Sequence, residues 1–463
     1  MLLNFKTKNF RSFKELVDLN MIKGSTRKHD ERIAEIGNSS VLKFSSIYGP
    51  NASGKSNLVM ALKVMQYIVL NNRIPTDAFK EYFRLDDSCA NKSTYFETII
   101  SVDNEIFSYG FEINLYTGII HSEWLINLKK KKDGQVTESL LFTRDENKID
   151  YHNKLSGYNG TKHMRLEICK EDILKNKKLL LLRRIIDVFS NVENPSDRPS
   201  DVFDVYNWFN INLKVVYPMG PLTTPEMIFS SVDKIKEMLK HFDTGITDII
   251  IQNKTEEEYN IENTPSGNPS FIIKSLVDNI FIGQKNGQVM FRFPSGLWII
   301  KKNHMNYEFN KLVFLHDSNI EHIFNSTNES DGTMRLFELF QPLMDSDNNS
   351  VYVIDELDRC LHPSLTIKYV DLFLEKAKNQ NDNTQLIVTT HESRLMNLEK
   401  LRRDEIWFFE KKNNVSSLFS LEDYNVRFDN VVDKAYMEGR YGAVPQIDYV
   451  ELIELLRNEN NKQ

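Results

Sequence analysis

The sequence has few cysteines and no apolar run long enough to span a bilayer. Its three cysteines, Cys89, Cys169 and Cys360, show neither paired spacing nor histidines at metal-ligand spacing. We therefore expect no disulfide and no zinc site, as in a protein of the reducing cytoplasm. Charged residues interrupt the apolar stretches well before the roughly 20 residues that a transmembrane helix needs. Residues 1–20 lack the basic start and apolar middle of a signal peptide, so we expect a cytoplasmic protein with no membrane partner.

An excess of basic residues is also absent. The chain has 58 Lys and Arg against 65 Asp and Glu, a net charge of −7, which argues against a broad basic face that coats nucleic acid. Four consecutive lysines, Lys129–Lys132, run into Asp133-Gly134, which favours a solvated hairpin turn over a DNA contact. Lys175–Arg184 interleaves basic and apolar residues and is typical of an amphipathic helix. No heptad repeat occurs, so no long coiled coil is expected.

A phosphate-binding loop is present at Gly49–Ser56, with the pattern G-x-x-x-x-G-K-S. Val41–Tyr48 before it has the composition of a buried strand, and Asn57–Asn71 after it has apolar residues at helical spacing. Backbone N–H groups and the helix start would surround the phosphates, Lys55 would reach the β- and γ-phosphates, and the Ser56 hydroxyl would bind Mg²⁺. A glycine-rich turn that binds nothing is the alternative. We expect ATP to contact Asn51, Ala52, Ser53, Gly54, Lys55, Ser56 and Asn57.

Two further strands end in polar residues. Ser350–Glu356 is an apolar strand that ends in two carboxylates, of which Asp355 would hold Mg²⁺ and Glu356 would orient the attacking water as the base. Gln385–Thr390 ends directly in His391, which could hydrogen-bond the γ-phosphate and the water. A solvated strand end and a capping histidine are the alternatives. We expect Lys55, Glu356 and His391 to be the catalytic residues.

A second anion site is indicated at Ser330–Thr333, which opens an apolar-periodic helix within Asn328–Gln341. Small residues and free N–H groups at a helix start bind phosphate. Because the chain already has its own phosphate loop, we expect this site to serve a nucleotide held by another subunit. An ordinary helix N-cap is the alternative.

The order of these motifs resembles the ABC-type ATPase heads of the RecF, Rad50 and SMC class. The similarity is closer to the bacterial AAA15/AAA21 group, which includes the OLD-like ATPases and the ATPase subunits of phage-defence pairs such as RloA, AbiLi and AriA. Asn9–Phe13, Arg402–Phe408 and Gly439–Pro445 match stretches of that group. The resemblance is specific at both ends of the chain and loose across the middle.

The resemblance implies an α/β fold: a P-loop ATPase head with a mixed β core, an antiparallel β-layer and an inserted, mainly helical module. It makes Ser330 and Gly332 contacts to the nucleotide of a second protomer, and Asp358–His362 a stretch at the dimer seam. It places Arg11 near the phosphates, against the alternative of a surface arginine on an edge strand. Ser-Asp-Gly-Thr stands where ABC proteins have Leu-Ser-Gly-Gly, and no Q-loop glutamine can be assigned.

The sequence pattern divides the chain into three segments. Residues 1–150 would form an N-terminal ATPase lobe with the antiparallel layer, 151–312 the inserted module, and 313–463 a C-terminal ATPase lobe. About seventy residues follow His391, too few for the Toprim nuclease domain of OLD-type proteins.

The function expected from the resemblance is an ATPase that closes around ATP and Mg²⁺ as a homodimer or higher homo-oligomer. It would act as the sensor or scaffold that controls a separately encoded effector, of the Toprim-like nuclease kind, in anti-phage defence, with a phage protein or DNA as the trigger. Two alternatives stay open: a RecF-like repair ATPase that clamps DNA, and a scaffold stabilised by ATP with negligible turnover.

Overall fold

The computed structural model describes residues 1–130, 136–217, 225–263, 286–304, 306–317, 322–345, 347, 349–424, 432–442 and 444. The chain forms two compact units. The large unit comprises Met1–Tyr217, Asn348–Leu357 and Ala377–Gln463, and the small unit comprises Pro218–Asp347 and Asp358–Lys376. These boundaries differ from the three expected segments, because residues 151–217 belong to the large unit and the small unit continues past residue 312. The expected division into functional domains stays a prediction.

The large unit contains a six-stranded sheet with a parallel core. Its order is β11-β17-β18-β5-β19-β20, in which the first five strands are parallel and β20 is antiparallel to β19. Strands β5, β17 and β18 are buried along their whole length, which is why they read as apolar runs without alternation. The strands are β5 (Phe44–Tyr48), β11 (Leu213–Val216), β17 (Val351–Ile354), β18 (Gln385–Thr389), β19 (Ile406–Lys412) and β20 (Val415–Ser420).

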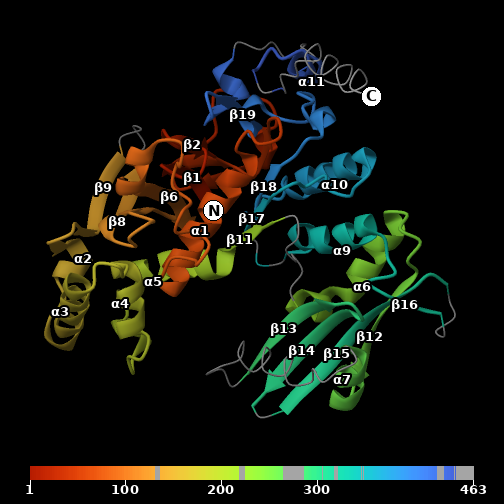
Figure 1. Cartoon of the computed structure of the whole chain (residues 1–463), viewed down its shortest axis with the longest axis horizontal. Helices are drawn as coiled ribbons and strands as arrows, with labels where there is room; N and C mark the ends of the chain where they lie inside the picture. The colour runs from red at the N-terminus through yellow and green to blue at the C-terminus, as the bar shows by residue number, and fades with distance from the viewer. Residues whose placement is uncertain are drawn as a thin grey trace, which may run out of the picture. The chain divides into compact units, whose positions relative to one another are not determined.

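A seven-stranded antiparallel sheet, in the order β10-β9-β8-β7-β6-β1-β2, forms the second layer of the large unit. Figure 1 shows its strands in red to orange beside helix α1. With the parallel core, this sheet confirms the α/β fold class. The strands are β1 (Leu2–Lys8), β2 (Val17–Asn20), β6 (Thr94–Val102), β7 (Glu105–Ile113), β8 (Ile120–Lys130), β9 (Val136–Arg144) and β10 (Ile149–Tyr151), and a separate hairpin consists of β3 (Ile33–Ile36) and β4 (Ser39–Leu42).

Helix α1 (Lys55–Asn71) joins the two sheets. Its Leu58, Val59 and Leu62 line one small apolar space together with Phe5 of β1 and Val353 of β17. Replacing such a buried leucine by alanine costs about 2–5 kcal/mol. This packing fixes the start of α1, and with it the loop that precedes the helix.

Four helices attach to the antiparallel sheet: α2 (Asn153–Ser156), α3 (Gly160–Lys175), α4 (Leu181–Phe189) and α5 (Ser200–Asn207). The buried carboxylate of Glu123 on β8 accepts hydrogen bonds from the backbone N–H groups of Leu181 and Leu182, at 2.6 and 2.9 Å. Because this carboxylate satisfies the start of α4, it fixes the helices to the sheet. Of the four leucines in the 175–184 stretch, Leu180 to Leu182 are fully buried and Leu179 is half-buried. The turn expected at Asp133-Gly134, with Lys131 and Lys132, lies outside the described residues.

The stretch that begins at Arg402 has a structural role. The Arg402 side chain is fully buried, and its Nη2 donates to Asp404 and to the carbonyl of Thr26, both at 2.7 Å. It thereby holds the loop after β2 against the start of β19. Helix α11 (Val432–Met437) follows β20 in the sequence. Ala443 and Pro445 of the closing stretch lie outside the described residues.

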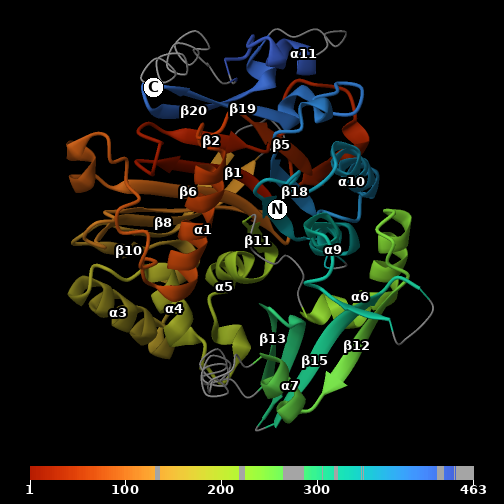
Figure 2. The same cartoon turned by 45° about the vertical axis from the view of Figure 1, so that its right-hand side comes forward.

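The small unit has an antiparallel sheet in the order β12-β15-β14-β13, with β16 beside β15. Figure 2 shows its strands in green with helices α6 and α7. Ile299, Leu312 and Phe314 of this sheet form one core with Phe337 and Phe340 of helix α9. The elements are α6 (Pro225–His241), β12 (Asp248–Lys254), α7 (Glu256–Asn263), β13 (Asn286–Phe293), β14 (Gly296–Asn303), β15 (Asn306–Leu315), β16 (Ile323–Asn325), α9 (Asp331–Met344) and α10 (Pro363–Lys376). None of the helices among the described residues is long and apolar enough to cross a membrane.

Candidate nucleotide site

The predicted site residues of the large unit follow neighbouring parallel strands. The phosphate loop follows β5, Asp355 and Glu356 follow β17, and His391 comes two residues after β18. In the sheet, β18 lies between β17 and β5, with Ile354 beside Val388 and Thr389 beside Ile47. Because the carboxyl ends of parallel strands meet at one edge, the structure brings the loop, the two carboxylates and the histidine to the same edge of the sheet.

The phosphate loop depends on its two glycines. Gly49 and Gly54 have φ angles of 151° and 121°, in the region that side chains disfavour. A Cβ atom on Gly49 would lie 2.8 Å from the carbonyl oxygen of Phe409, and one on Gly54 would lie 3.0 Å from Ser416 Oγ. A side chain at either position would therefore force the loop away from β19 and β20.

The polar groups of the loop suit a polyphosphate. Lys55 is buried, and its Nζ donates to the carbonyls of Gly49 and Pro50 at 2.6 and 3.1 Å. Within the described chain no side chain caps α1, whose first turn has no acidic residue, so the N–H groups of the helix start remain available to an anion. The buried Ser53 hydroxyl has no hydrogen-bond partner among the described residues, while Ser56 is exposed.

A hydroxyl that the sequence analysis did not single out organises the two carboxylates. Thr389 Oγ1 donates to Asp355 Oδ1 at 2.5 Å and accepts from the Glu356 N–H at 2.8 Å. Asp355 is buried, and Glu356 is half-buried with a φ of 50°. The left-handed backbone of Glu356 is a strained conformation for a residue with a side chain. The last residue of β18 therefore sets the backbone that presents both carboxylates, and the Thr-Thr-His ending of this strand is the signal that could have indicated it.

His391 is exposed at the same edge. The N–H of Thr390, the residue before it, donates to the carbonyl of Ile47 at 3.1 Å. This bond continues the pairing of β18 with β5 up to the start of the phosphate loop. The backbone thus holds His391 next to the loop strand, and its exposed ring can reach a ligand.

Arg11 is not on an edge strand but in the turn between β1 and β2, with a φ of 47°. Its guanidinium pairs with Glu81 and lies 3.4 Å from Asn57 Oδ1, on the first turn of α1. Asn57 also donates to Ser12 Oγ at 2.7 Å. The structure thus brings Arg11 beside the helix that follows the phosphate loop.

Comparison with known proteins assigns the family. A family profile described as "AAA domain, putative AbiEii toxin, Type IV TA system" (AAA_21) matches residues 44–397, a span that starts at β5 and includes the loop, both carboxylates and His391.

The chain belongs to the AAA_21 family. Membership implies a nucleotide-hydrolysing ATPase that binds ATP, typically with Mg²⁺. No curated protein matches the chain. The resemblance to an ABC-like ATPase family is confirmed at this level, while the OLD-like subgroup stays a prediction.

In this AAA_21 protein the predicted second anion site lies in the small unit. Ser330 is the N-cap of α9, and its Oγ accepts from the Thr333 N–H at 3.1 Å. A Cβ atom on Gly332 would lie 2.7 Å from the carbonyl oxygen of Cys360, so this glycine allows Asp358–His362 to pass close to the helix start. The N-cap that the sequence left as an alternative is present, and a contact to a second protomer stays a prediction.

Tyr217 is a further residue at the nucleotide edge that the sequence analysis missed. It follows β11, next to β17, and its hydroxyl donates to Met60 Sδ on α1 at 2.9 Å. Burial raises the pKa of its phenol, and the charges of Arg11 and Asp355 act on it in opposite directions. It stands at the end of the strand beside the carboxylates, where no motif marked it.

Proposed function

We propose that the chain is an ATPase that closes as a dimer around ATP and controls a separate effector protein. The observation that carries the proposal is the convergence of the phosphate loop, the carboxylates of Asp355 and Glu356, and His391 at one edge of a parallel sheet. A phosphate cradle, a metal carboxylate and a base on neighbouring strands are the parts that phosphoryl transfer to water requires.

Each residue then has a role. Lys55 neutralises phosphate charge, and the exposed Ser56 hydroxyl and the Asp355 carboxylate would hold Mg²⁺, which supplies further charge neutralisation when bound. Among the described residues no group of three or more His, Cys, Asp and Glu side chains could hold a metal. This agrees with an ion held by one carboxylate, one hydroxyl and phosphate oxygens. Glu356 orients and deprotonates the attacking water, and His391 donates to the phosphate being cleaved.

The dimer is supported by a second helix start that suits an anion. Ser330 caps α9, a helix of 14 residues, and the chain already has a phosphate loop of its own. We propose that this helix start contacts the nucleotide of the second protomer. The closed state is then favoured only while triphosphate is bound, because a ligand shifts an equilibrium by its difference in affinity for the two states.

A role in phage defence, in the cytoplasm, completes the proposal. It is supported by the family's description, which refers to a toxin and a type IV TA system, and by the resemblance to ATPase subunits encoded with a separate effector. The effector would be a Toprim-like nuclease or another toxic protein, and it would be released or activated when the dimer opens.

The test uses Glu356→Gln, with Glu399→Gln, an exposed glutamate outside the site, as the matched control. We expect Glu356→Gln to bind ATP normally and to hydrolyse it at least about 100-fold more slowly than the wild type. With ATP and Mg²⁺ it should form a stable dimer, measured by size-exclusion chromatography with light scattering. The neighbouring gene product, expressed together with it, should elute with the dimer.

If Glu356→Gln hydrolyses ATP as fast as the wild type, Glu356 is not the base. An ATP-dependent dimer that ignores the neighbouring protein but retains DNA would favour a DNA clamp instead.

A further inference from the structure

A cavity of 260 Å³ lies in the large unit at the edge of the parallel sheet opposite the phosphate loop. Asn212, Asn349 and Asn383 line it, and each stands one or two residues before β11, β17 or β18. The carboxyl ends of the same three strands carry Tyr217, the carboxylates and His391. Because a strand of four residues spans roughly 13 Å, the cavity is a separate place from the nucleotide site.

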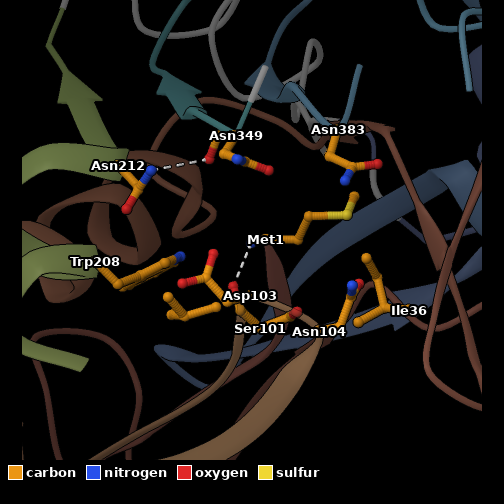
Figure 3. Close-up of a pocket in the computed structure, with 10 residues that line it drawn as sticks. Met1, Ile36, Ser101, Asp103, Asn104, Trp208, Asn212, Asn349 and Asn383 are labelled. Atoms are coloured by element: carbon orange, nitrogen blue, oxygen red, sulfur yellow. Dashed lines mark hydrogen bonds between the residues drawn. The ribbon is translucent and has the colours of Figure 1, made fainter. Parts of the chain in front are cut away.

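Four of the ten described lining residues are asparagines. Asn104 adds a fourth amide and Asp103 a carboxylate, both from the turn between β6 and β7. Asn212 Nδ2 donates to the carbonyl oxygen of Asn349 at 3.4 Å, as Figure 3 shows. The amides of Asn349 and Asn383 each offer an acceptor oxygen and donor N–H groups. A ligand that presents alternating donors and acceptors would match this wall.

A buried indole N–H provides the second observation. Trp208 is 1% exposed, and its Nε1 has no hydrogen-bond partner among the described residues. In Figure 3 this nitrogen faces the interior of the cavity. A buried donor without a partner is unfavourable, so it would favour the binding of a ligand that supplies an acceptor.

The remaining wall and the charge narrow the ligand class. Met1, Ile36 and Val102 provide apolar surface, suited to the face of a ring. The described lining residues include one carboxylate and no Lys, Arg or His side chain, and the α-amino group of Met1 donates to the carbonyl of Ser101 at 2.8 Å. Burial lowers the pKa of this amino group to about 5, so it carries little positive charge at neutral pH. The wall therefore disfavours phosphates and other anions. The volume lies below the range usual for drug-sized ligands, roughly 300–1,000 Å³.

We propose that this cavity binds a neutral, planar nitrogen heterocycle of the nucleobase or nucleoside class. Asparagine side chains recognise purine edges through paired donor and acceptor atoms. Trp208 supplies one donor to the ring, and Asp103 accepts from an N–H group of the ligand. Unlike the ATP site, the described lining of this cavity contains no lysine and no glycine-rich loop to hold a phosphate.

The test is isothermal titration calorimetry of the whole chain with the common nucleobases and nucleosides. An ATP analogue that cannot be hydrolysed, with Mg²⁺, is present in excess so that the phosphate loop is occupied. We expect one of these compounds to bind at one site per chain. Trp208→Phe keeps an aromatic ring, although a smaller one, and removes the N–H. It should weaken binding about tenfold, the effect of one lost hydrogen bond. Asn383→Ala, which removes one of the lining amides, should weaken it similarly.

Trp407→Phe is the matched control, because Trp407 also has a buried Nε1 without a partner in the described chain but does not line the cavity. It should leave binding unchanged. A thermal melt of each variant verifies folding, and Asn383→Ala keeps the test decisive if Trp208→Phe is unstable. The proposal is overturned if no nucleobase or nucleoside binds, or if both lining variants bind as the wild type does.

Discussion

Thr389 Oγ1 donates a 2.5 Å hydrogen bond to Asp355 Oδ1, from the last residue of β18 to the residue after β17. The same hydroxyl accepts from the N–H of Glu356. A hydroxyl has one proton to donate, and the direction of both bonds is therefore fixed. One side chain orients the expected metal ligand and the backbone of the expected base.

Replacing Thr389 by valine keeps the shape and removes this hydroxyl. Mutation of a residue that orients a metal ligand typically lowers metal affinity or activity by roughly 10–100-fold. We therefore expect ATP turnover to fall by about that factor and the Mg²⁺ concentration needed for half-maximal turnover to rise. Thr366→Val is the matched control, since the buried Thr366 hydroxyl has no partner among the described residues. Turnover measured against Mg²⁺ concentration decides, and equal curves for Thr389→Val and the wild type would refute the role.

Arg11→Ala tests whether the arginine beside α1 contacts the nucleotide. We expect the KM for ATP to rise at least about fivefold, because a charge-assisted bond to phosphate is lost. Glu81→Ala, which removes the partner of Arg11, should cause a smaller rise. Lys14→Ala removes a comparable cation that pairs with Asp86 at 2.9 Å and should leave KM unchanged. If Arg11→Ala and Lys14→Ala have the same KM for ATP, Arg11 does not contact the nucleotide and only forms an ion pair with Glu81.

Gly332→Ala tests the start of α9. The new Cβ would lie 2.7 Å from the Cys360 carbonyl oxygen, so the helix start or the Asp358–His362 stretch must move, at a cost of about 1–3 kcal/mol. We expect lower turnover and a weaker ATP-dependent dimer. In Gly157→Ala the nearest atom would be at 3.6 Å, and little change is expected. Normal turnover by a folded Gly332→Ala protein, measured with its thermal melt, would argue against a nucleotide role for this helix.

Stability should depend on pH through Glu405. Burial raises the pKa of its carboxyl to about 7 from an ordinary 4.5, although Arg32 at 3.4 Å and the Arg402 N–H at 2.8 Å lower it in part and the neighbouring Asp404 raises it. The folded state thus holds the proton more tightly than the unfolded state. The resulting stabilisation is complete below pH 4.5 and is lost as the pH rises to 7.

Relative to Glu405→Gln, which cannot ionise, the wild type should lose roughly 2–3 kcal/mol of unfolding free energy between pH 4.5 and 7. Urea unfolding at several pH values measures this difference. Glu399→Gln, at an exposed position, should follow the wild type. Parallel profiles for wild type and Glu405→Gln would show that the buried carboxyl does not titrate in this range.

Much of the candidate site could be predicted from the sequence. The phosphate loop, the carboxylate pair and the histidine each stand directly after an apolar run, and a short buried strand is recognisable from composition alone. The α/β fold class was implied by the family resemblance, and the parallel core and antiparallel layer confirm it. Thr389 and Tyr217 could not be predicted in this way, because their importance depends on which strands are neighbours in the sheet.

The sequence by itself determined which residues can bind a triphosphate, since the spacing of Gly49, Gly54, Lys55 and Ser56 is a local property of loop and helix. Only the tertiary structure decided that β18 lies between β17 and β5, which puts the Thr389 hydroxyl on Asp355. It also decided that Gly332 lies in another compact unit, against Cys360, and that three asparagines from distant parts of the chain surround one cavity. These relationships join residues far apart in sequence, and they arise from strand order and packing rather than from local pattern.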